Sequence, residues 1–458
     1  MKLRKIEPHI SRRDFVQAAG ITVWGTAVTP LAARSSEVLR PNVVLILPDQ
    51  HRWDALGCNG NADAITPNID RLAREGVNFS SSYAAQPVCS PNRSSAITGQ
   101  FPHKTGVIDN GIPLIDHSTS FPRLLQQAGY KTAYFGKWHL GPIDKDGRLV
   151  PPAYFDMWKA YHAGASFWLN KPKDFGRVSY NSPDEVPDFR GEAPGTYRTD
   201  LETDQAIDFV QANRNDPFCV ILGFCPPHRP WTAPVENLQR FKGRVKYPTY
   251  HAMVNRIDEN VGRLVSAIDA LALRENTIFI YTSDHGHNFE FRWNQHPKRL
   301  CYDTAAKVPL LFHWPGRFRR GTRRELISSV DIGPTILDLC GIEPPQGSHG
   351  RSAKGLLQGE ALGWREYAII ENRPLKAAEE GMFERCIVTD RWKLILNTSR
   401  EPELYDRAND PDEVRNVYAD PSVRSVKKEL MDRLEDWAWQ SGDGPAIRWL
   451  IQRWRRKV

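Results

Sequence analysis

Long apolar runs dominate the hydrophobic pattern up to residue 314. Uninterrupted runs of this kind are typical of strands that are covered on both faces. They occur at 41–47, 218–222, 277–281 and 308–314, and a shorter strand is predicted at 131–135. The pattern therefore predicts five strands of a buried sheet in this part of the chain.

Amphipathic helices are predicted between these strands. Thr66 and Pro67 are placed to open a helix that runs to Arg74, with Thr66 as its N-cap and Gly76 as its stop. Apolar residues at helical spacing predict further helices at 120–129, 197–214 and 253–271. Because strands alternate with helices, we expect an α/β fold with a large, mostly parallel central sheet and helices on both faces.

Two domains are predicted in the body of the chain. Residues 40–344 form the main α/β domain, and the segment 141–196, rich in Pro, Gly, Trp and Tyr, is expected to cross over one edge of its sheet. Beyond residue 345 the strands are shorter, so residues 345–458 are predicted to form a smaller α+β subdomain. Its expected elements are strands at 367–371, 385–389 and 392–397 and one terminal helix.

Charge and composition describe an ordinary globular chain with an unusual beginning. The 458 residues are 40% apolar and 25% charged, with a net charge of +7, of which +3 belongs to residues 1–33. The remaining +4 is mild, and no basic block with interleaved aromatics indicates nucleic-acid binding. The short basic end at 453–457 is more typical of a solvated terminus.

Residues 1–33 are predicted to be an export signal. Ser11–Phe15 resembles the twin-arginine motif, and the mildly apolar stretch 16–31 that follows is too diluted by Thr, Gly and Gln for a stable membrane span. We therefore expect export through the twin-arginine machinery to the periplasm or the outside. An ordinary amphipathic first helix is the alternative.

The spacing of the cysteines argues against two common kinds of cysteine site. No C-x-x-C pair occurs, which argues against a zinc ribbon and against a thioredoxin-like site. Spacing predicts no particular pairing, so buried free thiols and disulfides both stay open. The seven cysteines are Cys58, Cys89, Cys219, Cys225, Cys301, Cys340 and Cys386.

Polar residues follow several predicted strands directly. In a parallel sheet the carboxyl ends of the strands meet at one edge, where ligands bind. These side chains, although far apart in sequence, should therefore lie close together. They are Asp49 and Gln50, Lys137 and His139, His228, and Asp284 and His285.

One segment carries the most specific motif. Residues 89–99 match C-x-P-x-R-x-x-x-x-T-G at every fixed position, and over most of 41–420 the chain resembles the type I sulfatases of the alkaline phosphatase superfamily. The resemblance implies that a formylglycine-generating enzyme oxidises Cys89, and that the hydrated aldehyde attacks sulfur and later expels sulfate. On this resemblance 40–344 is the catalytic domain. A buried structural cysteine before a helix is the alternative reading of Cys89.

Further cationic residues are expected around the sulfate. Arg93 lies one helical turn after Cys89 and can face the same pocket. Residues 136–141 match the sulfatase motif G-K-W-H-L-G, which implies that Lys137 holds a sulfate oxygen and that His139 regenerates the aldehyde. The resemblance also implies that His228 touches sulfate and helps protonate the leaving oxygen, and that Lys298 is the second sulfate-binding lysine.

The expected metal ligands differ from the usual arylsulfatase set. Asp49 with Gln50, and Asp284 with His285, stand where arylsulfatases carry two Asp and Asp–Asn, and Cys89 completes the set. This variant is similar to choline sulfatases and phosphonate monoester hydrolases. One divalent cation is implied, with calcium as the family default. Manganese is the alternative, because an imidazole suits softer ions.

Other conspicuous residues match no expected ligand. His51, His287 and His296 are read as pocket walls or surface residues. Aromatic residues near 160 could contact a sugar ring, but packing within the loop is the preferred interpretation; they are Trp158, Tyr161, His162 and Trp168. The segment 403–406 is read as a structural turn.

Three functions are compatible with these residues. The first is hydrolysis of a sulfate monoester, of a sulfated carbohydrate or another small organic sulfate. The second is a phosphonate monoester or phosphodiester hydrolase using the same formylglycine, which the Asp–Gln and Asp–His pairs favour. The intact G-K-W-H-L-G favours the sulfatase. The third, an inactive sulfatase-like binding protein, is least favoured because every expected polar position is filled.

Overall fold

The computed structural model describes most of the chain beyond residue 39. The described residues are 40–163, 167–168, 196–289, 297–360, 363–372, 383–398 and 400–455. The predicted export signal, His296 and much of 141–196 lie outside them. The described residues form one compact unit.

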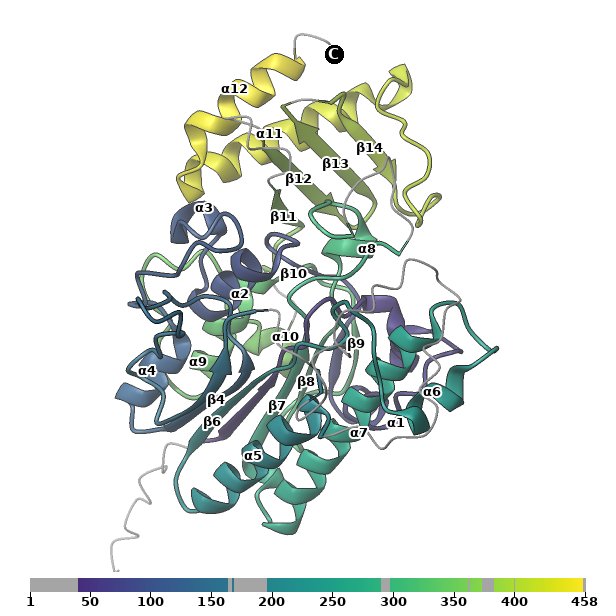
Figure 1. The fold of residues 1–458 in the computed structure, drawn as a ribbon. Helices are drawn as coiled ribbons and strands as arrows, with labels where there is room; N and C mark the ends of the chain where they lie inside the picture. The colour runs from purple at the N-terminus through teal and green to yellow at the C-terminus, as the bar shows by residue number, and fades with distance from the viewer. Residues whose placement is uncertain are drawn as a thin grey trace, which may run out of the picture. The chain divides into compact units, whose positions relative to one another are not determined.

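An eight-stranded sheet forms the centre of this unit (Figure 1). It is parallel throughout except for β8, which is antiparallel to both of its neighbours. The predicted mostly parallel α/β sheet is confirmed. In spatial order the strands are β5 (Met157–Tyr161), β4 (Lys131–Lys137), β6 (Phe218–Gly223), β1 (Asn42–Ile46), β7 (Thr277–Thr282), β8 (Leu310–His313), β2 (Val77–Phe79) and β9 (Gly321–Arg323).

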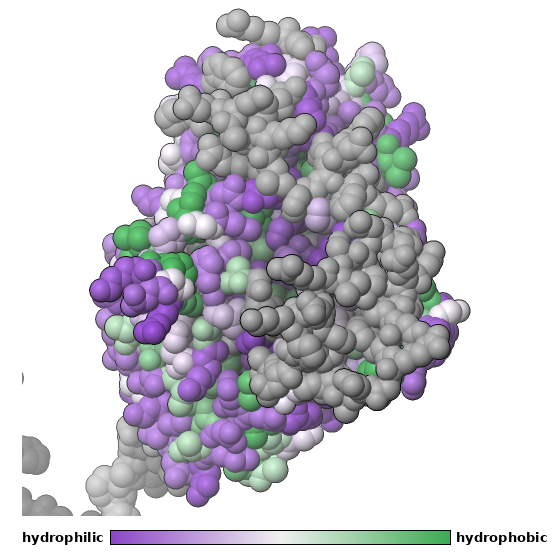
Figure 2. All heavy atoms as spheres, in the orientation of Figure 1, coloured by the Kyte–Doolittle hydropathy of each residue, from purple (hydrophilic) through white to green (hydrophobic). Residues whose placement is uncertain are grey.

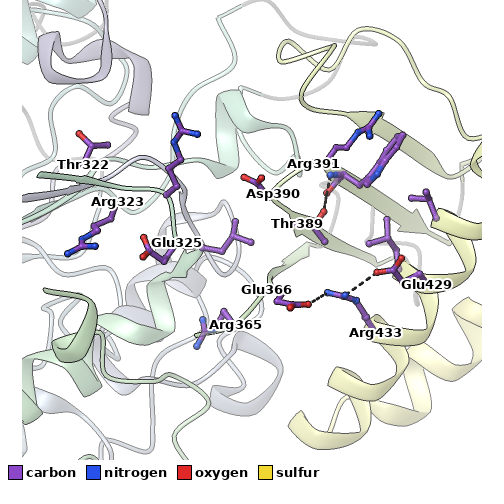
Figure 3. Close-up of a pocket in the computed structure, with 15 residues that line it drawn as sticks. Thr322, Arg323, Glu325, Arg365, Glu366, Thr389, Asp390, Arg391, Glu429 and Arg433 are labelled. Carbon is purple, nitrogen blue, oxygen red and sulfur yellow. Dashed lines mark hydrogen bonds and ion pairs between the residues drawn. The ribbon is translucent and has the colours of Figure 1, made fainter. Parts of the chain in front are cut away.

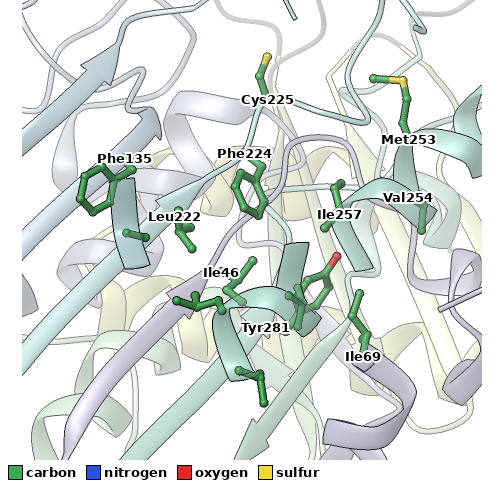
Figure 4. Packing of buried hydrophobic residues seen from close by; sticks show 14 of the residues in the cluster. Ile46, Ile69, Phe135, Leu222, Phe224, Cys225, Met253, Val254, Ile257 and Tyr281 are labelled. Atoms are coloured by element: carbon green, nitrogen blue, oxygen red, sulfur yellow. The ribbon is translucent and has the colours of Figure 1, made fainter. Parts of the chain in front are cut away.

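Helices cover both faces of the sheet because alternate strand residues point to opposite sides. In β1, Val44 and Ile46 belong to one apolar cluster, whereas Val43 and Leu45 belong to another. The first cluster packs against α1 (Pro67–Glu75), α5 (Arg198–Ala212), α6 (Val235–Phe241) and α7 (Pro248–Ala270), as Figure 4 shows for part of it. The second packs against α2 (Cys89–Thr98), α4 (Phe121–Gln127), α9 (Ile332–Leu339) and α10 (Lys354–Gln358).

Short elements connect these layers. The strands β3 (Ser82–Tyr83) and β10 (Ile327–Ser328) pair in parallel. The short helices are α3 (Pro102–Thr105), α8 (Asp303–Ala306) and the 3₁₀ turns at Trp53–Ala55, Gly57–Asn59, Arg274–Asn276, Ser329–Asp331 and Pro421–Val423.

The C-terminal part is a four-stranded antiparallel sheet with two helices. Its elements are β11 (Tyr367–Asn372), β12 (Glu384–Thr389), β13 (Trp392–Asn397), β14 (Glu403–Asp406), α11 (Arg424–Ser441) and α12 (Gly444–Arg455). Two predictions were wrong here. The single terminal helix is two helices, because Gly442 takes a left-handed φ of 88° and ends α11. Residues 403–406 are a strand, because they pair with β13.

Smaller differences separate the predicted and the observed elements. The strand predicted at 131–135 continues to Lys137, and β5 lies inside the segment 141–196, where no strand was predicted. Thr66 is the N-cap residue of α1, but its hydroxyl bonds Gly57 N and Asp70 instead of capping the helix. None of the seven cysteines, all of which are described, is in a disulfide.

The visible surface is mostly hydrophilic, with small separate apolar patches between the areas covered by grey atoms (Figure 2). Among the described helices, none combines the length and the apolar character that crossing a membrane would require.

Candidate active site

Three strand ends and one helix start bring the predicted site residues to one place. The loop after β1 carries Asp49 and Gln50, and the loop after β7 carries Asp284 and His285. Lys137 is the last residue of β4, two positions before His139. The short link after β3 ends at α2, of which Cys89 is the first residue. The parallel register thus brings polar residues from distant parts of the sequence to the carboxyl edge of the sheet.

Four of these residues form a compact cluster around the Cys89 thiol. One ligand atom from each of Asp49, Cys89, Asp284 and His285 lies within 4.8 Å of all the others. The Cys89 Sγ is 3.2 Å from His285 Nε2 and 3.7 Å from Asp49 Oδ1. All four side chains are completely buried. Oxygen, nitrogen and sulfur donors that converge in this way are suited to hold a metal ion.

Arg93 forms ion pairs with both carboxylates. Its Nε donates to Asp284 Oδ2 at 2.9 Å, and its Nη2 donates to Asp49 Oδ2 at 3.3 Å. Its Nη1 donates to the carbonyl oxygen of Lys137 at 2.8 Å. The side chain is 1% exposed, so Arg93 lies inside the site and not on the surface. One turn of α2 separates Arg93 from Cys89, as the spacing predicted.

Two lysines and a histidine surround the thiol from the other sides. The Lys298 Nζ lies 3.0 Å from Cys89 Sγ and 3.5 Å from His228 Nε2. The Lys137 Nζ donates to Asp49 Oδ2 at 2.5 Å. Both lysines are buried, whereas the His228 side chain keeps 29% of its surface exposed. His228 therefore lies at the rim of the site, and the lysines lie inside it.

A glycine fixes the turn that carries Lys137 and His139. Gly136 has a φ of +95°, and a Cβ placed on it would lie 2.4 Å from the carbonyl oxygen of Gly223. Any other residue would therefore push β4 away from β6. His139 itself has a φ of +60° and is 7% exposed. This close approach explains why the G-K-W-H-L-G turn begins with glycine.

The charges of the site separate the pKa values of its two carboxyl groups. Burial raises the pKa of Asp49, but the charges of Lys137, His228 and Arg93 outweigh it and hold the pKa well below its ordinary range. Burial, followed by the nearby Asp49, raises the pKa of Asp284 to about 7. Two buried carboxyl groups so close together repel each other when both are ionised. A divalent cation between them would remove this repulsion.

Gln50 supplies a second indication of a cation site. Its Oε1 is buried and has no hydrogen-bond partner, and its backbone has a φ of +62°. An unpartnered buried oxygen is costly unless a ligand satisfies it. Its backbone N–H donates to Asp284 Oδ1 at 3.1 Å, which keeps it beside the cluster. The donor set of Asp49, Gln50, Asp284 and His285 therefore fits a divalent cation.

The cationic surroundings also act on the thiol. Burial and the charge of Asp49 raise the pKa of Cys89. The positive charges of Lys137, Lys298 and His285 lower it by more, so the pKa lies well below its ordinary value. For His139, burial is the main cause of a lowered pKa. A neutral imidazole beside a nucleophile is suited to accept a proton.

Several positioning residues were missed in the sequence. The Ser90 hydroxyl donates to the carbonyl oxygen of His139 at 2.7 Å, and the Ser90 N–H donates to Asn110 Oδ1 at 3.0 Å. The Tyr134 hydroxyl donates to the carbonyl oxygen of Lys137 at 2.6 Å. Ser283 Oγ accepts from His51 N at 3.0 Å. Ser90 follows Cys89 and Ser283 precedes Asp284 in the sequence, so their nearness to predicted site residues could have indicated a positioning role. Nothing in the sequence around Asn110 or Tyr134 indicates such a role.

The remaining conspicuous residues lie outside the cluster. His51 and His287 are completely buried, the former beside Tyr281 and the latter against Trp231. His51 and His287 are thus buried residues and not surface residues. Trp158 packs on Trp138, as the packing interpretation predicted. His162 differs, because its ring meets that of His139 at 5.0 Å between centroids.

Glu202 gives a prediction about pH. This buried residue of α5 lies behind β4, and burial raises its pKa to about 8 from 4.5. Between these values the folded protein holds a proton that the unfolded chain releases, so the free energy of unfolding falls as pH rises from about 4.5 to about 8. At about 1.4 kcal/mol per pKa unit the loss is roughly 5 kcal/mol.

Glu202→Gln removes this titration. Urea unfolding of both proteins at pH 5 and pH 8 is expected to show equal stability at the lower pH within about 1 kcal/mol and a more stable variant at the higher pH. Identical pH profiles for the two proteins would show that Glu202 does not hold the proton.

Comparisons with known proteins agree with this arrangement. A family model described as Sulfatase matches residues 41–342, and one described as N-sulphoglucosamine sulphohydrolase, C-terminal, matches residues 290–440. The N-acetylglucosamine-6-O-sulfatase of Bacteroides thetaiotaomicron is 28% identical over 91% of this chain and 91% of its own length.

Solved structures extend the comparison to three dimensions. One, in complex with its substrate D-glucosamine-2-N,6-O-disulfate, has a TM-score of 0.73 and 27% identity over 89% of this chain and 99% of that chain. The phosphonate monoester hydrolase of Agrobacterium radiobacter has a TM-score of 0.77 and 23% identity over 88% of this chain and 96% of its own, which is a likeness of fold alone. The predicted family and fold are confirmed: the chain belongs to the formylglycine-type sulfatase family and is a sulfatase, a hydrolase of sulfate esters.

Proposed function

We propose that the enzyme hydrolyses sulfate monoesters of carbohydrates, with a formylglycine made from Cys89 as its nucleophile. The observation that carries this proposal is the setting of Cys89. The residue starts a helix, is completely buried, and lies between a candidate cation site and the side chain of Lys298, 3.0 Å away. A hydrated aldehyde at this position has one hydroxyl available for attack on sulfur and another for the later release of sulfate.

The residues around Cys89 are proposed to bind the sulfate and to transfer protons. Lys137 and Lys298 are placed to bind sulfate oxygens and to stabilise their charge in the transition state. His139 is placed to remove the proton that regenerates the aldehyde. His228 is proposed to donate a proton to the leaving oxygen. Its pKa is lowered to about 4, chiefly by burial, and the negative charge of a bound sulfate would raise it again.

Asp49, Gln50, Asp284, His285 and the oxidised Cys89 are the residues that would hold the cation. A divalent cation held there would polarise the sulfate ester and would lower the pKa of the attacking hydroxyl. Calcium is our first choice, as the family default. Manganese is the alternative, because His285 offers a nitrogen ligand.

Replacement of His285 tests this assignment. In His285→Asn an amide replaces the imidazole, and carbonyl oxygen favours calcium over manganese. After equilibration with equal concentrations of the two ions, we expect elemental analysis to show a higher calcium fraction than in the parent enzyme. His117→Asn, in a loop outside the cluster, is the control. If metal content and selectivity do not change in His285→Asn, this residue is not a ligand.

The phosphonate or phosphodiester hydrolase stays the second candidate, because Asp–Gln and Asp–His pairs resemble those enzymes. Enzyme co-expressed with a formylglycine-generating system would be assayed on p-nitrophenyl sulfate, bis-p-nitrophenyl phosphate and p-nitrophenyl phenylphosphonate. We expect the sulfate to be hydrolysed fastest. Faster turnover of either phosphorus ester would overturn the first choice. An enzyme with converted Cys89 and no turnover of any of the three would favour a very selective enzyme or the binding protein.

A carbohydrate substrate is proposed from the relatives. The curated relative is named for N-acetylglucosamine 6-O-sulfate, and the solved structure holds a sulfated glucosamine. A panel of sulfated monosaccharides assayed beside choline sulfate discriminates the classes. Choline sulfate as the best substrate would contradict the carbohydrate assignment.

Export is proposed from residues 1–33 alone, which lie outside the described residues. In a twin-arginine-competent bacterium the mature protein should be found in the periplasm or the medium without these residues. N-terminal sequencing of the fractionated protein checks this. An intact N-terminus in the cytoplasm would overturn it.

A further inference from the structure

The loop that carries Lys298 contains an unusual backbone conformation. Arg299, the next residue, has a φ of +66°. A residue with a Cβ is strained in this left-handed region, and it stays there only where its neighbours hold it. The Lys298 Nζ lies 3.0 Å from Cys89 Sγ. A change in the turn at Arg299 would therefore move this lysine relative to Cys89.

Three contacts hold the turn at Arg299. Its backbone N–H donates to the carbonyl oxygen of Pro87 at 3.0 Å, and its carbonyl oxygen accepts from Asn372 Nδ2 at 2.7 Å. Its Nη2 donates to Asp109 Oδ1 at 2.5 Å. Pro87 lies two residues before Cys89, and Asp109 belongs to the loop that bonds the start of α2. The turn is thus tied to two segments beside the proposed nucleophile.

Asn372 reaches this turn from the C-terminal sheet. It is the last residue of β11 and is completely buried. Its Nδ2 also donates to Glu384 Oε2 at 2.7 Å, on the residue that faces it in β12. Both partners of Nδ2 are hydrogen-bond acceptors, so only the NH₂ group of an amide suits this position. The sheet therefore fixes the amide that holds the carbonyl oxygen of Arg299.

A second bond ties the end of β11 to the segment before Cys89. The backbone N–H of Glu371 donates to the carbonyl oxygen of Ala85 at 2.8 Å. The opposite end of β11 lies at a cleft of about 760 Å³ between the segment 322–326 and the C-terminal part (Figure 3). There Glu366 pairs with Arg433, so this ion pair stays within the C-terminal part. Of the two ends of β11, the end at Asn372 is the one that bonds the loop of Lys298.

We propose that Asn372 and Arg299 are positioning residues for Lys298, and that the C-terminal sheet thereby helps to form the active site. Asn372 holds the carbonyl oxygen of Arg299, and the turn at Arg299 sets the place of Lys298 Nζ. This inference rests on the proposed role of Lys298 in binding a sulfate oxygen. Displacement of such a group by about 1 Å can lower the rate about a hundredfold.

A double-mutant cycle with Lys298 tests the proposal. In Asn372→Ala the carbonyl oxygen of Arg299 loses its donor. We expect kcat/KM for p-nitrophenyl sulfate to fall at least about tenfold, and the inhibition constant of inorganic sulfate to rise. Lys298→Met alone should lose about a hundredfold. In the Lys298→Met background, Asn372→Ala should change kcat/KM less than about twofold, because the group that it positions is gone.

A matched control comes from the same part of the chain. Asn416 also holds backbone groups of the C-terminal part. Asn416→Ala should change kcat/KM less than about twofold in either background, because additivity is expected for residues that share no partner. Circular dichroism melting shows whether each variant is folded.

Two variants of Arg299 give an independent test, which also serves if Asn372→Ala does not fold. Arg299→Ala and Arg299→Gly both lose the ion pair with Asp109, but only glycine accepts the left-handed turn without strain. We therefore expect Arg299→Ala to lose at least about threefold more kcat/KM than Arg299→Gly. Equal losses in these two variants would overturn the role of the turn.

The cycle separates failure of this inference from failure of the proposed function. An equal loss in Asn372→Ala with and without Lys298 would show that Asn372 acts on the whole fold, and would overturn the positioning role. Full activity of Lys298→Met would overturn the sulfate-binding role of Lys298 and the positioning role with it. If the parent enzyme prefers a phosphorus ester, the same cycle is measured on that ester.

Discussion

Replacement of Cys89 by alanine is expected to abolish sulfate-ester hydrolysis while the protein stays folded. The substitution removes the atom that becomes the nucleophile, and the other three members of the cluster, Asp49, Asp284 and His285, are proposed to hold the cation. Loss of a catalytic nucleophile in comparable enzymes costs a factor of about 10⁶. We therefore expect turnover of p-nitrophenyl sulfate to fall below about one part in a thousand.

Folding should tolerate this change because the lost volume is one sulfur atom. The melting temperature, measured by circular dichroism, is expected to change by only a few degrees. Cys58→Ala, at a half-buried cysteine outside the cluster, is the matched control and should keep full activity. Residual activity of Cys89→Ala above one part in a thousand, in a preparation free of parent enzyme, would place the nucleophile elsewhere.

Replacement of Arg93 by alanine is expected to have the largest effect on stability. Asp49 and Asp284 would keep their burial but lose the guanidinium that lies 3.3 and 2.9 Å from their oxygens. Removal of one partner from a buried pair costs about 3–5 kcal/mol, since the remaining charge stays unsolvated. Urea unfolding should show this loss as a lower midpoint with an unchanged slope.

An arginine on the protein surface is the control for this stability measurement. Arg263 pairs with Asp204 on the exposed side of α7, and both side chains keep about half of their surface exposed. Arg263→Ala should cost less than about 1 kcal/mol. Added divalent cation is expected to restore part of the stability of Arg93→Ala, because it binds the folded state and neutralises the same carboxylates. If Arg93→Ala loses no more free energy of unfolding than Arg263→Ala, Arg93 does not stabilise the two buried carboxylates.

Much of the fold could be predicted because its signals are local. The run at 43–47 is apolar at every position, so it predicts a strand covered on both faces. The position of Arg93 one turn after Cys89 follows from helix geometry. In contrast, β5 and β14 contain mixed residues, and only pairing with β4 and β13 makes them strands. The break at Gly442 was missed because one glycine does not by itself end a helix.

By itself the sequence determined the strand-and-helix order, the helix that starts at Cys89, and the residues that should meet at the strand ends. These features depend on near neighbours along the chain, which periodicity and motifs record. Only the tertiary structure decided that Arg93 is buried between two carboxylates and that Gln50 has an unpartnered oxygen. Such facts depend on which distant segments pack together, and packing is a property of the whole fold.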